Sequence, residues 1–83
     1  NLKVRPNPVS DRFAIDIYST KNEETAQIFL YDGLGRLMLN QTATLTEGGN
    51  TIKINVDELK TGIYYLQVID STGKQVTETI MKQ

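Results

Sequence analysis

The residue types that most often carry enzyme chemistry are scarce in this sequence. Its 83 residues include no histidine and no cysteine, which removes the usual general base near neutral pH, the thiol nucleophile and most transition-metal sites. The serines lie in polar or turn-like segments without an activating base, at Ser10, Ser19 and Ser71. We therefore predict no catalytic residue and no cofactor, and we expect that the chain is not an enzyme.

Acidic side chains are the remaining candidates for a site. They are adjacent at residues 23–24 and 57–58, but neighbours in a strand or loop point apart, so we interpret both pairs as solvated surface. A calcium ion held by oxygen ligands from Asp57, Glu58 or Asp70 is the alternative interpretation. The sequence has no dense acidic loop of the kind that calcium sites use, so we assign no metal ligand.

Charge and hydropathy limit the kinds of partner. The formal net charge is −1, with acids and bases interspersed, so we expect no basic face and no nucleic-acid partner. No apolar run approaches the roughly 20 residues that span a membrane. The length suits one domain over residues 1–83. Because the chain starts without methionine or a signal-type segment, we expect it to be part of a larger protein.

The strongest apolar stretch follows Gly62, whose backbone freedom allows a sharp turn into a strand. Over residues 63–69 both alternating sets of side chains are largely apolar, which predicts a central strand covered on both faces. Leu59 is expected to plug the end of the core. Tyr64 either packs simply or forms a tyrosine corner, in which a buried ring bonds through its hydroxyl group to backbone a few residues upstream.

Two turn motifs have an Asp at the first position, a Gly at the fourth and a basic residue at the fifth. This pattern favours a type I turn closed by a left-handed glycine. For the first motif, Asp32 and Gly33 alone could instead form a two-residue turn with a different strand register. The motifs are Asp32-x-x-Gly35-Arg36 and Asp70-x-x-Gly73-Lys74.

Short alternating segments recur along the rest of the chain. Pro6 and Pro8, on either side of Asn7, break the first of them. Residues 47–50 are expected to form a flexible loop. About seven short strands with frequent turns predict an all-β protein, an immunoglobulin-like antiparallel β-sandwich. The expected strands cover residues 2–4, 12–18, 26–31, 36–45, 51–56, 63–69 and 75–81.

Five motifs in order give the chain a family resemblance. They are Pro6-Asn7-Pro8, then Ile28-x-Leu30-Tyr31-Asp32-x-x-Gly35-Arg36, then Asn50-x-Ile52, then Leu59-x-x-Gly62-x-Tyr64-x-Leu66-x-Val68, and a Lys near the end. The series resembles the type A C-terminal sorting domain of the Por, or type IX, secretion system of Bacteroidetes. Two positions depart from that family: Gly33 replaces a usual apolar residue, and Glu78 stands where a base is common, leaving Lys82 as the base of the last strand.

The resemblance implies a non-catalytic signal that directs a larger secreted protein through an outer-membrane translocon. It further implies transit through the periplasm, removal by a sortase-like peptidase before Asn1 or close to it, and a final location on the outer-membrane surface or outside the cell. The last strand is the expected recognition element, through an exposed edge and the residues Lys74, Glu78, Lys82 and Gln83. Lys82 is expected to be exposed and to contribute little to the core.

Other partners and functions remain open at this stage. An exposed edge strand can pair with a second copy of the chain, so an edge-strand homodimer is a further expectation. An accessory immunoglobulin-like module that binds carbohydrate or protein is the alternative function, with Phe29 and Tyr65 as its candidate aromatics. A passive spacer is the third interpretation.

Overall fold

In a computed structural model, which describes residues 2–83, the chain forms seven β-strands and no helix. The predicted cleavage point beside Asn1 lies outside the described residues. The strands are β1 (Leu2–Arg5), β2 (Arg12–Ser19), β3 (Glu24–Asp32), β4 (Leu37–Leu45), β5 (Gly48–Asn55), β6 (Gly62–Ile69) and β7 (Gln75–Lys82).

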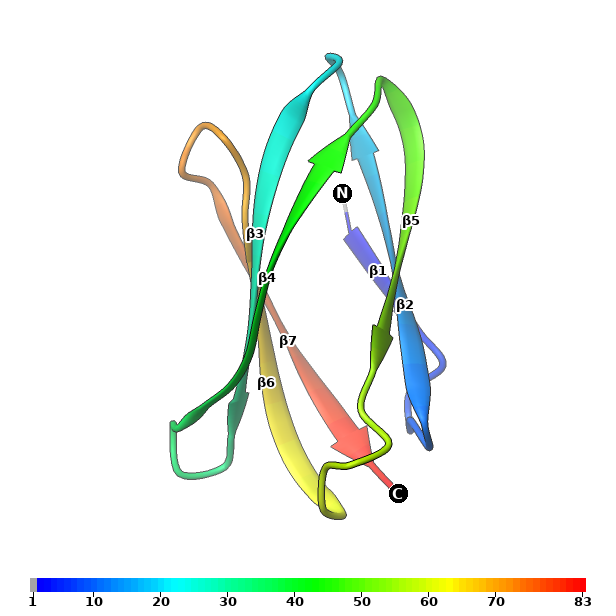
Figure 1. Cartoon of the computed structure of the whole chain (residues 1–83), viewed down its shortest axis with the longest axis vertical. Coiled ribbons are helices and arrows are strands. Elements are labelled where there is room, and N and C mark those ends of the chain that lie inside the picture. Colours follow the sequence, from blue (N-terminus) through cyan, green and yellow to red (C-terminus); the bar gives the residue numbers. More distant parts are fainter. Residues whose placement is uncertain (1) are drawn as a thin grey trace.

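The strands form two antiparallel sheets that face each other (Figure 1). One sheet has the order β1-β2-β5 and the other the order β4-β3-β6-β7. Alternate residues of each strand point between the sheets and make a single core, so the predicted sandwich is confirmed. Its buried side chains are Val9, Phe13, Ile15, Ala26, Ile28, Leu30, Leu45, Ile54, Val56, Tyr64, Leu66, Val68 and Ile80.

The prediction that β6 is covered on both faces is wrong. Strand β6 is central in its sheet, between β3 and β7, and Leu66 on its inner face is 1% exposed. On its outer face, however, Tyr65 is 42% exposed. A two-layer sandwich leaves each sheet with one face toward solvent, so the second apolar set of β6 lies on the surface.

The flexible loop predicted at residues 47–50 is also wrong in part. Gly48, Gly49 and Asn50 belong to β5 and pair with Ser19, Tyr18 and Ile17 of β2. The Asn50 side chain also accepts a hydrogen bond from the backbone N–H of Thr46 at 3.0 Å. Ladder bonds depend on backbone groups, so a glycine pair can extend a strand that side-chain pattern alone does not reveal.

The outer face of the three-stranded sheet is basic, contrary to the expectation from overall charge. In register across β1, β2 and β5 lie four exposed bases and one acid, Asp16. Asp16 accepts hydrogen bonds from the Arg5 guanidinium group, one of them at 3.1 Å, and from the Thr51 hydroxyl group at 2.9 Å. The bases are Lys3, Arg5, Arg12 and Lys53.

Candidate recognition surface

The outer edge of β7 is divided into two halves. Strand β7 is the last strand of its sheet, and after β1 the chain crosses from one sheet to the other and reaches this edge at Val9. The Val9 N–H donates to the carbonyl of Met81 at 2.8 Å, and the Gln83 N–H donates to the carbonyl of Val9 at 2.7 Å. We call residues 79–83 of this edge, with the crossing segment 6–9, the closed half, and residues 74–78 the open half.

Asn7 of the Pro6-Asn7-Pro8 motif supplies two of the four hydrogen bonds that close this half of the edge. The Asn7 side-chain amide donates to the carbonyl of Thr79 at 2.9 Å and accepts from the N–H of Met81 at 3.1 Å. One side chain therefore satisfies two backbone groups of an edge strand that would otherwise be unpaired. Sequence reasoning identified the motif but not this role, because the contact joins residues at opposite ends of the chain.

Lys82 is buried rather than exposed, so the expectation for this residue is wrong. Only 7% of it is accessible, because it lies between Gly62 of β6 and Val9. Its ammonium group reaches the carbonyl oxygen of Gln83 at 3.0 Å. Lysine can bury its aliphatic stem while its charged end keeps a polar partner, and Lys82 is therefore part of the closed half.

Tyr64 forms the tyrosine corner, one of the two arrangements that the sequence left open for it. The residue is 6% exposed, and its hydroxyl group donates to the carbonyl of Lys60 at 2.7 Å, four residues upstream. Leu59 packs against the core at the same end, as expected, and Gly62 begins β6 with a φ of 157°. The connection from β5 to β6 is thus fixed by the buried ring of Tyr64, by its hydrogen bond to Lys60 and by the packing of Leu59.

The two Asp-x-x-Gly turns adopt the same conformation at opposite ends of the sandwich. The Gly35 N–H donates to the carbonyl of Asp32 at 3.0 Å, and the Gly73 N–H donates to that of Asp70 at 3.0 Å. The two glycines have φ values of 85° and 88°. The type I turn with a left-handed glycine is therefore confirmed, and the two-residue alternative at Asp32 is excluded.

The carboxylates of these turns differ in their partners. The pKa of Asp32 is lowered chiefly by the Arg36 N–H at 2.9 Å and, against the effect of burial, also by the Arg36 guanidinium at 2.7 Å. The pKa of Asp70 is lowered chiefly by the Thr72 hydroxyl group at 2.6 Å. Asp32 is 8% exposed, whereas Asp70 lies in a more open turn.

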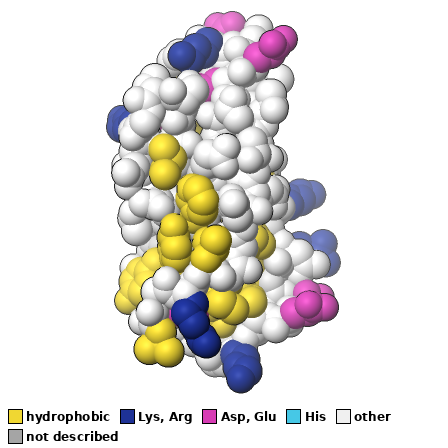
Figure 2. All heavy atoms as spheres, turned by 60° about the vertical axis from the view of Figure 1, so that its left-hand side comes forward, with side chains coloured by type: hydrophobic (Ala, Val, Ile, Leu, Met, Phe, Trp, Pro, Cys, Tyr) yellow, Lys and Arg dark blue, Asp and Glu magenta, His cyan; other side chains and the backbone are white. Residues whose placement is uncertain are grey.

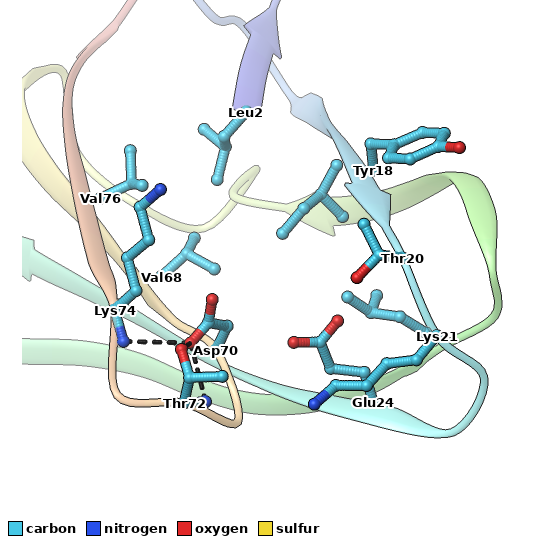
Figure 3. Close-up of a pocket in the computed structure, with 12 residues that line it drawn as sticks. Leu2, Tyr18, Thr20, Lys21, Glu24, Val68, Asp70, Thr72, Lys74 and Val76 are labelled. Carbon is cyan, nitrogen blue, oxygen red and sulfur yellow. Dashed lines mark hydrogen bonds between the residues drawn. The ribbon is translucent and has the colours of Figure 1, made fainter.

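A groove adjoins the open half of β7 (Figure 3). Its volume is about 300 Å³, and it lies at the end where the N-terminal part of β1 faces the start of β7. The floor is apolar and includes Leu2, Val68 and Val76, while the rim is polar and includes Lys21, Glu24 and Asp70. Figure 3 shows the Lys74 side chain running past Val76, away from the Asp70 carboxylate.

The four predicted recognition residues do not form one cluster. Lys74 and Glu78 belong to the open half and are exposed, whereas Lys82 and Gln83 belong to the closed half. The acids considered for calcium are also apart, because Asp57 and Glu58 precede β6 and Asp70 follows it. Within residues 2–83 no three acidic side chains gather to hold a metal ion.

The outer face of the four-stranded sheet carries most of the large exposed apolar side chains. The strand registers place only uncharged residues on this face. Figure 2 shows the apolar groups gathered on one part of it. Phe29 and Tyr31 stack with ring centroids 6.3 Å apart, and Tyr65 lies opposite Tyr31 in the register. Sequence reasoning named Phe29 and Tyr65 but missed the neighbours, which are Leu37, Ile63 and Met81.

The fold and the tyrosine corner define an immunoglobulin-like sandwich. Comparison with family models identifies it further: residues 3–83 match the secretion system C-terminal sorting domain. The chain belongs to this family of type IX secretion signals, which direct export toward the outer membrane or the extracellular space. A search of curated proteins gives no match. No helix in the described part of the chain could cross a membrane.

Proposed function

We propose that the domain directs an attached protein from the periplasm through the outer-membrane translocon and is then removed by a sortase-like peptidase that cleaves before Asn1 or close to it. The observation that carries this proposal is the family match over residues 3–83, which covers all of the sandwich except the first residue of β1. The domain acts as a label rather than as an enzyme. Its working parts are a stable fold and a surface that the export machinery binds.

The C-terminal segment is the proposed contact with the machinery. Gln83 is exposed at the end of the closed half, beside the buried stem of Lys82. Because Val9 fixes the backbone of Gln83 by a hydrogen bond of 2.7 Å, this tail has a defined position on the domain. A receptor would therefore meet an ordered tail whose side chains and backbone are already placed, which lowers the entropy cost of binding.

A reporter fusion tests this function. A soluble reporter with its own inner-membrane export signal is fused ahead of residues 1–83 and produced in a host with the type IX machinery. We expect the fusion to reach the cell surface or the medium without the domain attached. Retention of the intact fusion in the periplasm of a competent host would contradict the proposal.

Variants of the tail test the proposed contact separately. Because Lys82 is buried, Lys82→Met is preferable to alanine: it removes the charge while it keeps most of the apolar stem. Together with Gln83→Ala it should leave the domain folded and reduce export. Glu47→Ala, at an exposed position between β4 and β5 at the opposite end of the sandwich from Gln83 (Figure 1), is the control. Normal export of the folded double variant would assign recognition to another part of the domain.

The outer aromatic face favours a second candidate function. Phe29, Tyr31 and Tyr65 lie on one uncharged sheet surface (Figure 2), and aromatic rings on a flat surface can stack on sugar rings. On this alternative the chain is an accessory module that binds neutral carbohydrate. Retention on insoluble polysaccharides that is lost in Tyr65→Ser would support it, and failure to bind any polysaccharide tested would reject it.

A further inference from the structure

The open half of β7 has unpaired backbone groups that face away from its neighbour. Within an antiparallel pair, the backbone groups of successive residues point alternately toward the partner strand and away from it. In the closed half the outward groups belong to Thr79 and Met81, since these bond to Asn7 and Val9. By the same alternation, the backbone N–H and C=O groups of Gln75 and Thr77 point away from β6. Among the described residues, none forms a hydrogen bond with these outward backbone groups.

The side chains of this half have a symmetric pattern. Lys74, Val76 and Glu78 are spaced by two, so they share the inner side of the strand. Val76 is partly buried, whereas both charged side chains are exposed. Neither Lys74 nor Glu78 forms an ion pair with another residue of the described chain. The pattern along the open half is therefore base, aliphatic, acid.

This pattern is complementary to itself when it is reversed. We propose that two copies of the chain associate through their β7 edges, antiparallel and with the two-fold axis at Val76. Each Lys74 then lies opposite Glu78 of the second copy, and the two Val76 side chains meet at the centre. A two-fold interface requires such self-complementarity, and a different register would place like charges or a charge and a valine opposite each other.

The backbone geometry fits the same register. The outward groups of Thr77 lie opposite those of Gln75 in the second copy, which allows two N–H···O=C bonds on each side of the axis. The valines form the intervening close pair without hydrogen bonds. The window is bounded by the Gly73 turn on one side and by the Asn7 contact with Thr79 on the other. The result is one continuous eight-stranded sheet across both copies.

The groove explains why the partner pairs at this half of the edge. Its floor at Leu2 and Val68 lies beside Val76 (Figure 3), so the second copy's Val76 can bury apolar surface there. At the closed half, the segment 6–9 occupies the corresponding space. This association does not depend on export, and it holds whether or not the proposed sorting function does.

Charge reversal provides the test, with sedimentation equilibrium from about 10 µM to about 2 mM, the range suited to a small interface. Lys74→Glu and Glu78→Lys should each weaken association of the otherwise folded chain roughly tenfold or more, because two like-charge pairs replace two opposite-charge pairs. An equal mixture of the two variants should form the mixed dimer, and the double variant should recover association. These rescues separate pairing from a loss of folding.

Backbone pairing is tested at Thr77. Thr77→Pro removes an outward N–H without removing a bond to β6, so it should abolish association, whereas Thr77→Ala should not. The proposal is overturned if the wild-type chain stays monomeric throughout the range, or if its dimer is indifferent to the charge reversals and to Thr77→Pro. A dimer lost only on Tyr65→Ser would instead place the interface on the outer aromatic face.

Discussion

The closed and open halves of β7 show how one strand can serve two purposes. At the closed half, Asn7 and Val9 satisfy the strand's edge, and Tyr64 fixes the adjoining connection. At the open half the edge is unpaired and adjoins a groove of about 300 Å³. The difference arises from a single crossing segment, residues 6–9, that covers only part of the edge. The closed half therefore has four hydrogen bonds on its outer edge, and the open half keeps the backbone groups that the proposed dimer would use.

The largest expected effect is at the tyrosine corner, which lies beside the closed half of β7. Tyr64→Ala should lower the free energy of unfolding by about 3 kcal/mol, because it removes a buried ring and leaves a cavity. Tyr64→Phe keeps the ring and loses only the bond to Lys60, so it should cost about 1 kcal/mol. Urea denaturation measures both. Equal costs for the two variants would show that the hydroxyl group, rather than the ring, dominates.

The Asn7 contact should come next. Asn7→Ala removes two hydrogen bonds to β7 and should cost about 1–2 kcal/mol, at about 1 kcal/mol for each bond. Asn7→Asp retains the acceptor for the Met81 N–H but places a second carboxylate oxygen against the Thr79 carbonyl, so near neutral pH it should cost at least as much as alanine. Amide hydrogen exchange should show faster exchange of Met81 in the alanine variant. If that amide is unaffected, the closed half does not depend on Asn7, and the distinction between the halves weakens.

The two turns allow the same substitution at both ends. Gly35→Ala and Gly73→Ala should each lower the free energy of unfolding by about 1–2 kcal/mol, because alanine disfavours a left-handed backbone. No atom lies within 4 Å of the added Cβ at either position, so no steric clash adds to this cost. Gly49→Ala is the control: Gly49 has no left-handed φ and no atom near the added Cβ, so this change should be neutral or slightly stabilising. Thermal denaturation of all three would show whether the turns are equivalent. A much larger cost at Gly35 would indicate that the substitution also disturbs the ion pair between Asp32 and Arg36, and that this pair contributes to the stability of the domain.

The smallest effect should appear in the pH dependence. The folded-state pKa values of Asp16, Asp32 and Asp70 are lowered, so their contribution to stability is present above the unfolded pKa of about 3.9. It is lost as pH falls through the folded values. Urea denaturation at several pH values between 2 and 7 should show this loss of stability, and the loss should be smaller in Asp32→Asn. If Asp32→Asn loses as much stability at low pH as the wild-type chain does, Asp32 does not contribute to the pH dependence.

The strands and the Gly73 turn were predictable because they depend on local patterns, whereas the sequence left the tyrosine corner and the register at Asp32 each as one of two alternatives. Alternation over a few residues identifies a strand, and Asp70 with Gly73 specifies a turn within four residues. The burial of Lys82 was not predictable, since it results from Gly62 and Val9 meeting it from distant segments. The Asn7 contact likewise joins residues 72 positions apart. Sequence therefore located the motifs, while tertiary pairing decided which of them closes the β7 edge.

The most direct test of the sorting function compares the reporter fusion in two matched hosts, one with the outer-membrane translocon and one without it. The quantity to measure is the fraction of reporter at the cell surface and in the medium, with protease resistance of the domain as the check on folding. We expect export of the fusion in the first host, periplasmic accumulation in the second, and no export of the reporter alone in either. A folded fusion that remains in the periplasm of both hosts would contradict it.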